Sequence, residues 1–80
     1  MVTIRFFAQL RDVVGTDSLQ FAADDLEQVY AHLQRTLGAE IYTQLRAENV
    51  RVAVNQDIVS ANQRLVGGDE VAFLPPVTGG

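Results

Sequence analysis

The stretch Val2-Thr3-Ile4-Arg5-Phe6-Phe7-Ala8 (VTIRFFA), at the start of the chain, places an apolar side chain at every second position. In a β-strand, successive side chains point to opposite faces of the sheet. The pattern therefore predicts a strand that buries Val2, Ile4 and Phe6 in the core. It places Phe7 on the opposite face, although Phe7 is as apolar as its neighbour Phe6.

The rest of the chain supplies one long amphipathic helix and several shorter elements. Asp25 is a candidate N-cap with Gln28 at the capping-box position, and an apolar stripe runs from there to Leu37, before Gly38. Before this helix, after the first strand, we expect a helical turn over 9–14 and a strand over 18–22. After it we expect a second helical stretch over 39–47 and then strands over 50–54, 58–59 and 69–74. That order predicts an α+β fold with one main helix packed on one face of a mixed sheet of four to five strands. The β-grasp (ubiquitin-like) fold is one of several α+β rolls with this layout.

The composition argues against several classes of function. A chain of 80 residues is one small domain, and its net charge of −4 argues against a nucleic-acid ligand. The absence of cysteine excludes a disulfide, a thiol nucleophile and a thiolate metal site, and no side-chain cluster predicts a metal site of another kind. No signal peptide or membrane span is apparent, so we expect a cytoplasmic protein without membrane contact.

The end of the chain, after the last predicted strand, has an unusual composition. Pro75 and Pro76 favour a stiff, extended exit from that strand. Gly79 and Gly80 have no Cβ, so they fit a narrow channel and leave the terminal carboxylate unhindered. We therefore divide the chain into a domain over 1–75 and an extended tail over 76–80. The tail is either a disordered end or a segment on which chemistry takes place.

Four motifs decide between these two interpretations: Phe6-Phe7-Ala8 with Arg11, Val54-Asn55-Gln56, Gly68-Asp69-Glu70-Val71-Ala72-Phe73, and Pro75-Pro76-Val77-Thr78-Gly79-Gly80. With them the chain resembles, over nearly all its length, the small sulfur-carrying subunits of molybdopterin synthase, in the MoaD/ThiS family of ubiquitin-like proteins. The family's fold is the β-grasp.

The resemblance implies a chemistry centred on Gly80. An E1-like adenylyltransferase uses ATP to adenylate the Gly80 carboxylate, and a persulfide donor then converts it to a thiocarboxylate. The tail, with Gly79 next to its end, enters the active site of the large synthase subunit and donates sulfur to cyclic pyranopterin monophosphate. Two transfers build the molybdopterin dithiolene. The chain itself binds no cofactor or metal and contributes no acid or base, so it is a non-catalytic subunit of a sulfurtransferase.

The resemblance also implies a docking surface and an assembly of two carriers with two large subunits. Strand alternation places Phe7 and Leu74 on the helix-free face, where Ile58 joins them and Arg11 supplies a rim contact. The tail residues Pro75, Pro76, Val77 and Thr78 complete the expected partner-binding set. The residues alone leave open that Phe7 is covered by the 9–14 segment or by the tail, or that these are scattered surface residues.

Three other functions are compatible with a Gly-Gly end. The first is a sulfur carrier for thiamine thiazole synthesis, and the second is a ubiquitin-like modifier joined to target lysines through Gly80. The third is a passive interaction module with an inert tail. The chain has no lysine of its own, so a modifier of this sequence cannot form lysine-linked chains on itself.

Overall fold

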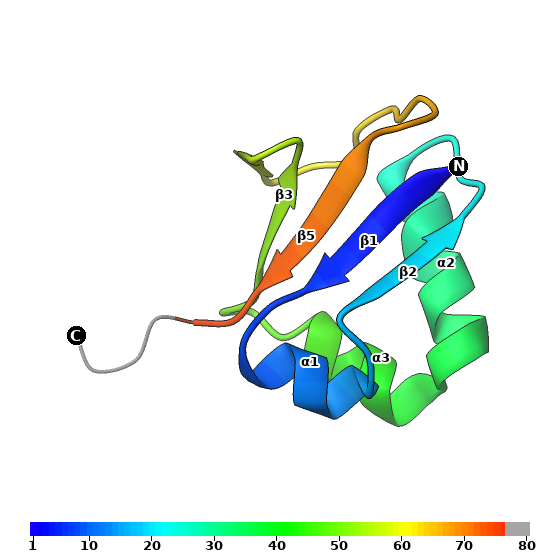
Figure 1. Ribbon diagram of the computed structural model, residues 1–80. Coiled ribbons are helices and arrows are strands. Elements are labelled where there is room, and N and C mark those ends of the chain that lie inside the picture. The colour runs from blue at the N-terminus through cyan, green and yellow to red at the C-terminus, as the bar shows by residue number, and fades with distance from the viewer. Residues whose placement is uncertain (77–80) are drawn as a thin grey trace.

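A computed structural model describes residues 1–76 of the protein. It contains five strands and three helices in this part of the chain (Figure 1), namely β1 (Val2–Phe6), α1 (Gln9–Val14), β2 (Ser18–Phe21), α2 (Leu26–Leu37), α3 (Ala39–Leu45), β3 (Arg51–Val54), β4 (Asp57–Val59) and β5 (Glu70–Leu74). Every element predicted from the sequence is present. None of the helices in this part of the chain is long and apolar enough to cross a membrane.

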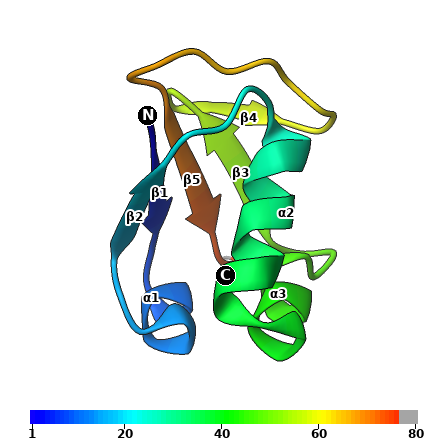
Figure 2. The ribbon, with the colours of Figure 1, turned by 90° about the vertical axis from the view of Figure 1, so that its right-hand side faces the viewer.

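The strands form one mixed sheet in the order β2-β1-β5-β3-β4. The two central strands, β1 and β5, run parallel, whereas the other three pairs are antiparallel. Helix α2 packs on one face of the sheet, and α1 and α3 lie at the end where β1 finishes (Figure 2). No helix within residues 1–76 covers the other face, which we call the open face. The predicted α+β layout is therefore confirmed.

The core lies between the central strands and α2. Its most deeply buried side chains come from β1, β5 and α2 and are at most 2% exposed: Val2, Ile4, Phe6, Val71, Phe73, Leu26, Val29 and Leu33. The rings of Phe6 and Phe73 stack with their centroids 5.7 Å apart, and Tyr30 of α2 meets Phe73 edge-on at 6.1 Å. The alternation predicted for the first strand is thus confirmed, because Phe6 is buried and Phe7 is 37% exposed.

Helix α2 begins and ends at the predicted residues. The Asp25 carboxylate accepts a hydrogen bond from the Gln28 backbone N–H at 2.9 Å, as expected of an N-cap. The Gln28 side chain accepts in return from the backbone N–H of Asp24, one residue earlier than in a standard capping box, at 2.8 Å. Gly38, with φ of 90°, ends the helix in a conformation that favours glycine.

Several strand bounds differ by one or two residues from the sequence expectation. The first strand ends at Phe6 because Ala8 adopts φ of 51°, which turns the chain out of the sheet and into α1. The second and third strands are each one residue shorter than expected, and the last begins at Glu70 rather than Asp69. In contrast, β4 includes Asp57. The domain boundary after residue 75 stays a prediction, since most of the tail lies outside the described residues.

We expect two adjacent and identical side chains to differ sharply in their effect on stability. Phe6→Ala should lower the free energy of unfolding by about 3–5 kcal/mol, because it removes a ring from a filled core. Phe7→Ala should lower it by less than about 1 kcal/mol, as is usual for a surface substitution. Denaturant unfolding of each variant measures both values. Equal losses for the two variants would contradict the strand register described above.

Candidate docking face

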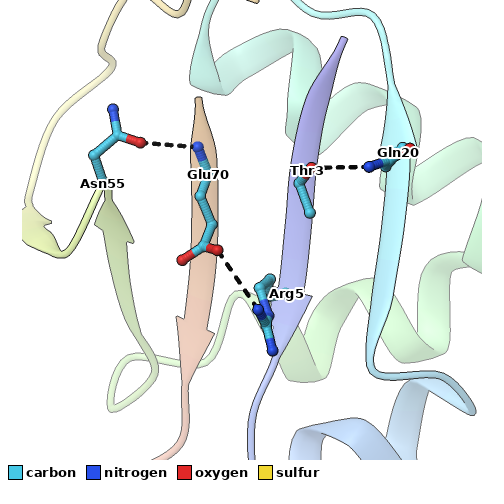
Figure 3. Close-up of polar contacts among 5 residues, drawn as sticks. All are labelled: Thr3, Arg5, Gln20, Asn55 and Glu70. Carbon is cyan, nitrogen blue, oxygen red and sulfur yellow. Dashed lines mark hydrogen bonds and ion pairs between the residues drawn. The ribbon is translucent and has the colours of Figure 1, made fainter. Parts of the chain in front are cut away.

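The open face of the sheet changes from polar to apolar along its length. At the end where β1 and β5 begin, Gln20, Thr3 and Glu70 of three neighbouring strands and Asn55, in the turn after β3, form a polar row (Figure 3). The Gln20 amide donates to the Thr3 hydroxyl at 3.2 Å, and the Glu70 backbone N–H donates to the Asn55 side-chain oxygen at 3.0 Å. These groups already have hydrogen-bond partners within the chain, so this end has little need of a docking partner.

The middle of the face is flat and largely apolar. The register places Arg5 beside Ala72, Ala72 beside Ala53, and Ala53 beside Ile58. The two alanines are small and buried, with Ala72 7% and Ala53 3% exposed. Ile58, at the β4 edge, is 56% exposed. A partner would therefore meet Ile58 and the Arg5 side chain rather than the alanines.

The end of the face where β5 finishes carries Phe7, Leu74 and Arg51. Leu74 of β5 pairs with Arg51 of β3 on one side. On the other side of β5, Phe7 follows Phe6 of β1, which pairs with Phe73, and the Phe7 backbone N–H donates to the Phe73 carbonyl at 3.3 Å. Phe7 stays exposed on this face, so α1 does not bury it. Sequence reasoning therefore placed Phe7 and Leu74 correctly as neighbours. Ile58 shares their face but lies one row away, across Ala53.

The remaining predicted site residues lie around this end. Arg11 is exposed on α1, where its backbone N–H donates to the Ala8 carbonyl at 3.1 Å, one turn after Phe7. Pro75 and Pro76 follow β5 and are half-buried. The predicted tail residues Val77, Thr78, Gly79 and Gly80 lie outside the described residues. The partner-binding roles of all these residues stay predictions.

The sequence analysis missed two arginines on the open face. The Arg5 guanidinium lies 5.5 Å from the centroid of the Phe7 ring, and one of its nitrogens lies 3.7 Å from a Glu70 carboxylate oxygen (Figure 3). Arg51 lies beside Leu74 on the neighbouring strand. Strand alternation places Arg5 on the same face as Phe7, but the position of Arg51 depends on the pairing between β3 and β5.

Comparison with known proteins identifies the family. The model of the ThiS family matches residues 4–80 of the chain. This protein belongs to the ThiS family. It is 45% identical to the molybdopterin synthase sulfur carrier subunit of Escherichia coli (strain K12) and 38% identical to that of Haemophilus influenzae, and each alignment covers the whole of both chains.

A solved structure confirms the β-grasp fold of this ThiS-family chain. It is the complex of subunits 1 and 2 of the molybdopterin-converting factor from Helicobacter pylori 26695. The matched chain is 29% identical, the match covers 99% of this chain and 97% of that one, and the TM-score is 0.74. A ThiS-family relative of this fold is thus known in a complex with a second subunit.

In this ThiS-family chain a side-chain network fastens the turn between β3 and β4 to the start of β5. Asn55 and Gln56 form the turn with φ of 49° and 76°. The Asn55 amide donates to one Asp69 carboxylate oxygen at 3.0 Å, and the Val66 backbone N–H donates to the other at 2.9 Å. Asn55 thus bonds to both Asp69 and Glu70, which fixes the turn that leads into β4 and Ile58.

The hydrogen bond from Asn55, and then that from Val66, lowers the pKa of Asp69 below its ordinary value of 3.8, because both donors stabilise the ionised carboxylate. The folded protein therefore binds fewer protons at this carboxylate than the unfolded chain does. The stability that Asp69 contributes is present above pH 3.8 and is lost as the pH falls through the lowered pKa of the folded state.

A groove on the helix side of the sheet is lined mainly by residues outside the open face, although Arg51 also contributes to it. This groove of about 620 Å³ runs between α2 and the β3–β4 side of the sheet, and there the Arg46 guanidinium stacks 3.9 Å from the centre of the Tyr30 ring. Burial raises the pKa of Tyr30, although the neighbouring Arg46 opposes this shift. Within residues 1–76, no group of His, Cys, Asp and Glu side chains could hold a metal ion.

We expect Asp69→Asn to destabilise the protein at neutral pH, because an amide has only one oxygen to accept the two hydrogen bonds. The difference from the unsubstituted protein should shrink as the pH falls from 3.8 through the lowered pKa of folded Asp69, because the wild-type carboxylate becomes protonated over that range. Denaturant unfolding at pH 7 and at several acidic pH values measures this difference in the free energy of unfolding. Asp17→Asn, outside the network, controls for the lost charge. A difference that is constant with pH contradicts the assigned role of the carboxylate.

Proposed function

We propose that this protein is the sulfur-carrier subunit of a molybdopterin synthase. The observation that carries the proposal is the full-length, 45% identity with the E. coli subunit of that name. The Helicobacter complex supports a partner subunit as well, because that carrier-like chain is found together with a second subunit. The open face is consistent with such a partner, since no helix within residues 1–76 covers it and its apolar end adjoins the start of the tail.

The chemistry of the proposal is that of an activated C-terminal carboxylate. An E1-like enzyme uses ATP to join AMP to Gly80 and releases pyrophosphate. The terminal sulfur of a persulfide attacks the carbonyl carbon, forms a C–S bond and displaces AMP. A thiol then cleaves the S–S bond of the original persulfide, which leaves the Gly80 thiocarboxylate and a disulfide. This sulfur is a soft nucleophile at neutral pH, and it is transferred to cyclic pyranopterin monophosphate in the large subunit. A second carrier supplies the second sulfur of the dithiolene.

In this proposal the carrier contributes positioning and no acid–base chemistry. Residues 75–78 span the distance from the sheet to the partner's active site, and Gly79, which has no Cβ, allows the reacting end to enter it. The open face docks on the large subunit through Phe7, Leu74 and Ile58, with Arg11 at the rim, and this docking positions the tail. Catalytic acids and bases belong to the large subunit. The assembly has two carriers and two large subunits and works in the cytoplasm, and the carrier itself holds no cofactor.

The identity of the partner and the mass of the protein test the proposed function. The full chain should co-purify from its native cells with the large synthase subunit, and its intact mass should show one oxygen replaced by sulfur. Co-purification with a thiazole synthase instead identifies a carrier for thiamine synthesis. Recovery of Gly80 in an isopeptide bond identifies a protein modifier, and an unchanged mass with no such bond identifies a passive module.

Deletion of Gly80 should abolish sulfur transfer and leave the domain folded. The new terminus would be Gly79, which is chemically similar but one residue, roughly 3.3–3.6 Å, short of the reacting position. The measurement is molybdopterin formation by purified large subunit, activating enzyme and sulfur donor, together with thermal unfolding of the carrier. Normal product formation by the shortened carrier contradicts the role given to Gly80.

Phe7→Glu should weaken binding to the large subunit and leave the carrier folded. Burial of a Phe side chain contributes about 1.5–3 kcal/mol, which is roughly ten- to a hundredfold in Kd, and a buried unpaired charge adds a further cost. Val66→Glu is the matched control, because Val66 is 64% exposed but lies outside the open face. Titration calorimetry measures the affinity of each variant for the large subunit. Equal affinities for the two variants rule out docking through this face.

A further inference from the structure

Two arginines lie on opposite sides of the apolar residues of β5. Arg5 of β1 pairs with Ala72, and Arg51 of β3 pairs with Leu74. Both side chains belong to the open face, because each alternates along its strand with residues that pack toward the core. The apolar centre of the face is therefore flanked by a guanidinium group on each side.

The charges of these arginines are weakly neutralised within the chain. The contact of Arg5 with Glu70 is 3.7 Å long, and the two side chains are 45% and 37% exposed. Exposed ion pairs of this kind contribute only about 0–1 kcal/mol. Arg51 is exposed and takes part in no salt bridge among residues 1–76. The face is thus locally cationic, although the chain carries a net charge of −4.

Contact with a partner at Phe7 also removes water from Arg5. The Arg5 guanidinium lies over the Phe7 ring at 5.5 Å, so a partner side chain that covers this ring also shields the arginine. A charged group that loses its hydration destabilises the complex unless it gains a hydrogen-bonding counter-charge. The planar guanidinium has several N–H donors, and a carboxylate accepts two of them at once.

From this geometry we infer that the large subunit carries carboxylate side chains opposite Arg5 and Arg51, on either side of the apolar group that covers Phe7 and Leu74. The inference rests on the proposed function, because it describes the partner that docks on this same face. The two arginines select an acidic partner surface and orient the carrier on it, while the apolar contact supplies most of the affinity.

Charge reversal at Arg51 tests the inference directly. Arg51→Glu should slow association with the purified large subunit by about tenfold at low salt, and the effect should largely vanish near 1 M salt. Arg35→Glu makes the same change in net charge on α2, away from the open face, and should alter the rate less than about twofold. Stopped-flow kinetics at several salt concentrations measure these rates. Equal rates for the two variants at every salt concentration overturn the inference.

Exchanging the two charges of the Arg5–Glu70 pair tests whether the location of a charge matters when the net charge is kept. The double variant Arg5→Glu/Glu70→Arg retains an opposite-charge pair on the same two strands and the same net charge. It should nevertheless bind the large subunit about tenfold more weakly, because an acid now faces the proposed carboxylate of the partner. Unchanged affinity contradicts a partner carboxylate at Arg5. Charge effects depend on a working complex, so failure of the unsubstituted protein to bind any large subunit overturns the proposed function instead.

Discussion

The parallel pairing of β1 with β5 is the constraint on which the rest of the structure depends. It joins the first and last strands at the centre of the sheet and aligns Phe6 with Phe73 inside the core. Because the two strands run in the same direction, they also finish at the same end of the sheet (Figure 1). Phe7 and Leu74 consequently lie together on the outside, next to the residues that begin the tail. One pairing thus builds the core and places Phe7 and Leu74, the proposed docking residues, beside the exit of the chain from the sheet.

The two faces of this sheet have different physical tasks. On the helix side, large apolar side chains fill the space under α2 and provide the stability of a small domain. On the open face, two alanines keep the centre flat, and the polar groups at the far end are satisfied within the chain. The apolar side chains Phe7 and Leu74 therefore lie at the end of the face near the tail. This distribution gives a docking partner one preferred orientation rather than several.

The point at which the chain leaves the sheet follows from the same strand order. β5 has a neighbour on each side, so its last residue leaves the centre of a rigid sheet rather than a free edge. The network of Asn55 and Asp69 fixes the start of this strand and the turn beside it. In the proposed function the carrier contributes the position of its terminal carboxylate, and this placement of β5 supports that role.

The sequence by itself determined the elements and the faces that they present. Alternation separated buried Phe6 from exposed Phe7, and the cap at Asp25 with the glycine at position 38 bounded the main helix. Local signals of this kind are read from neighbouring residues, so they are visible in the sequence. They could not show which strands pair, and so the positions of Arg51 beside Leu74 and of Ile58 across Ala53 depended on the fold. The turn at Ala8 and the contacts of Arg5 with Phe7 and Glu70 were also decided by tertiary structure. The physical reason is that strand register is set by packing between distant segments, which a local pattern does not contain.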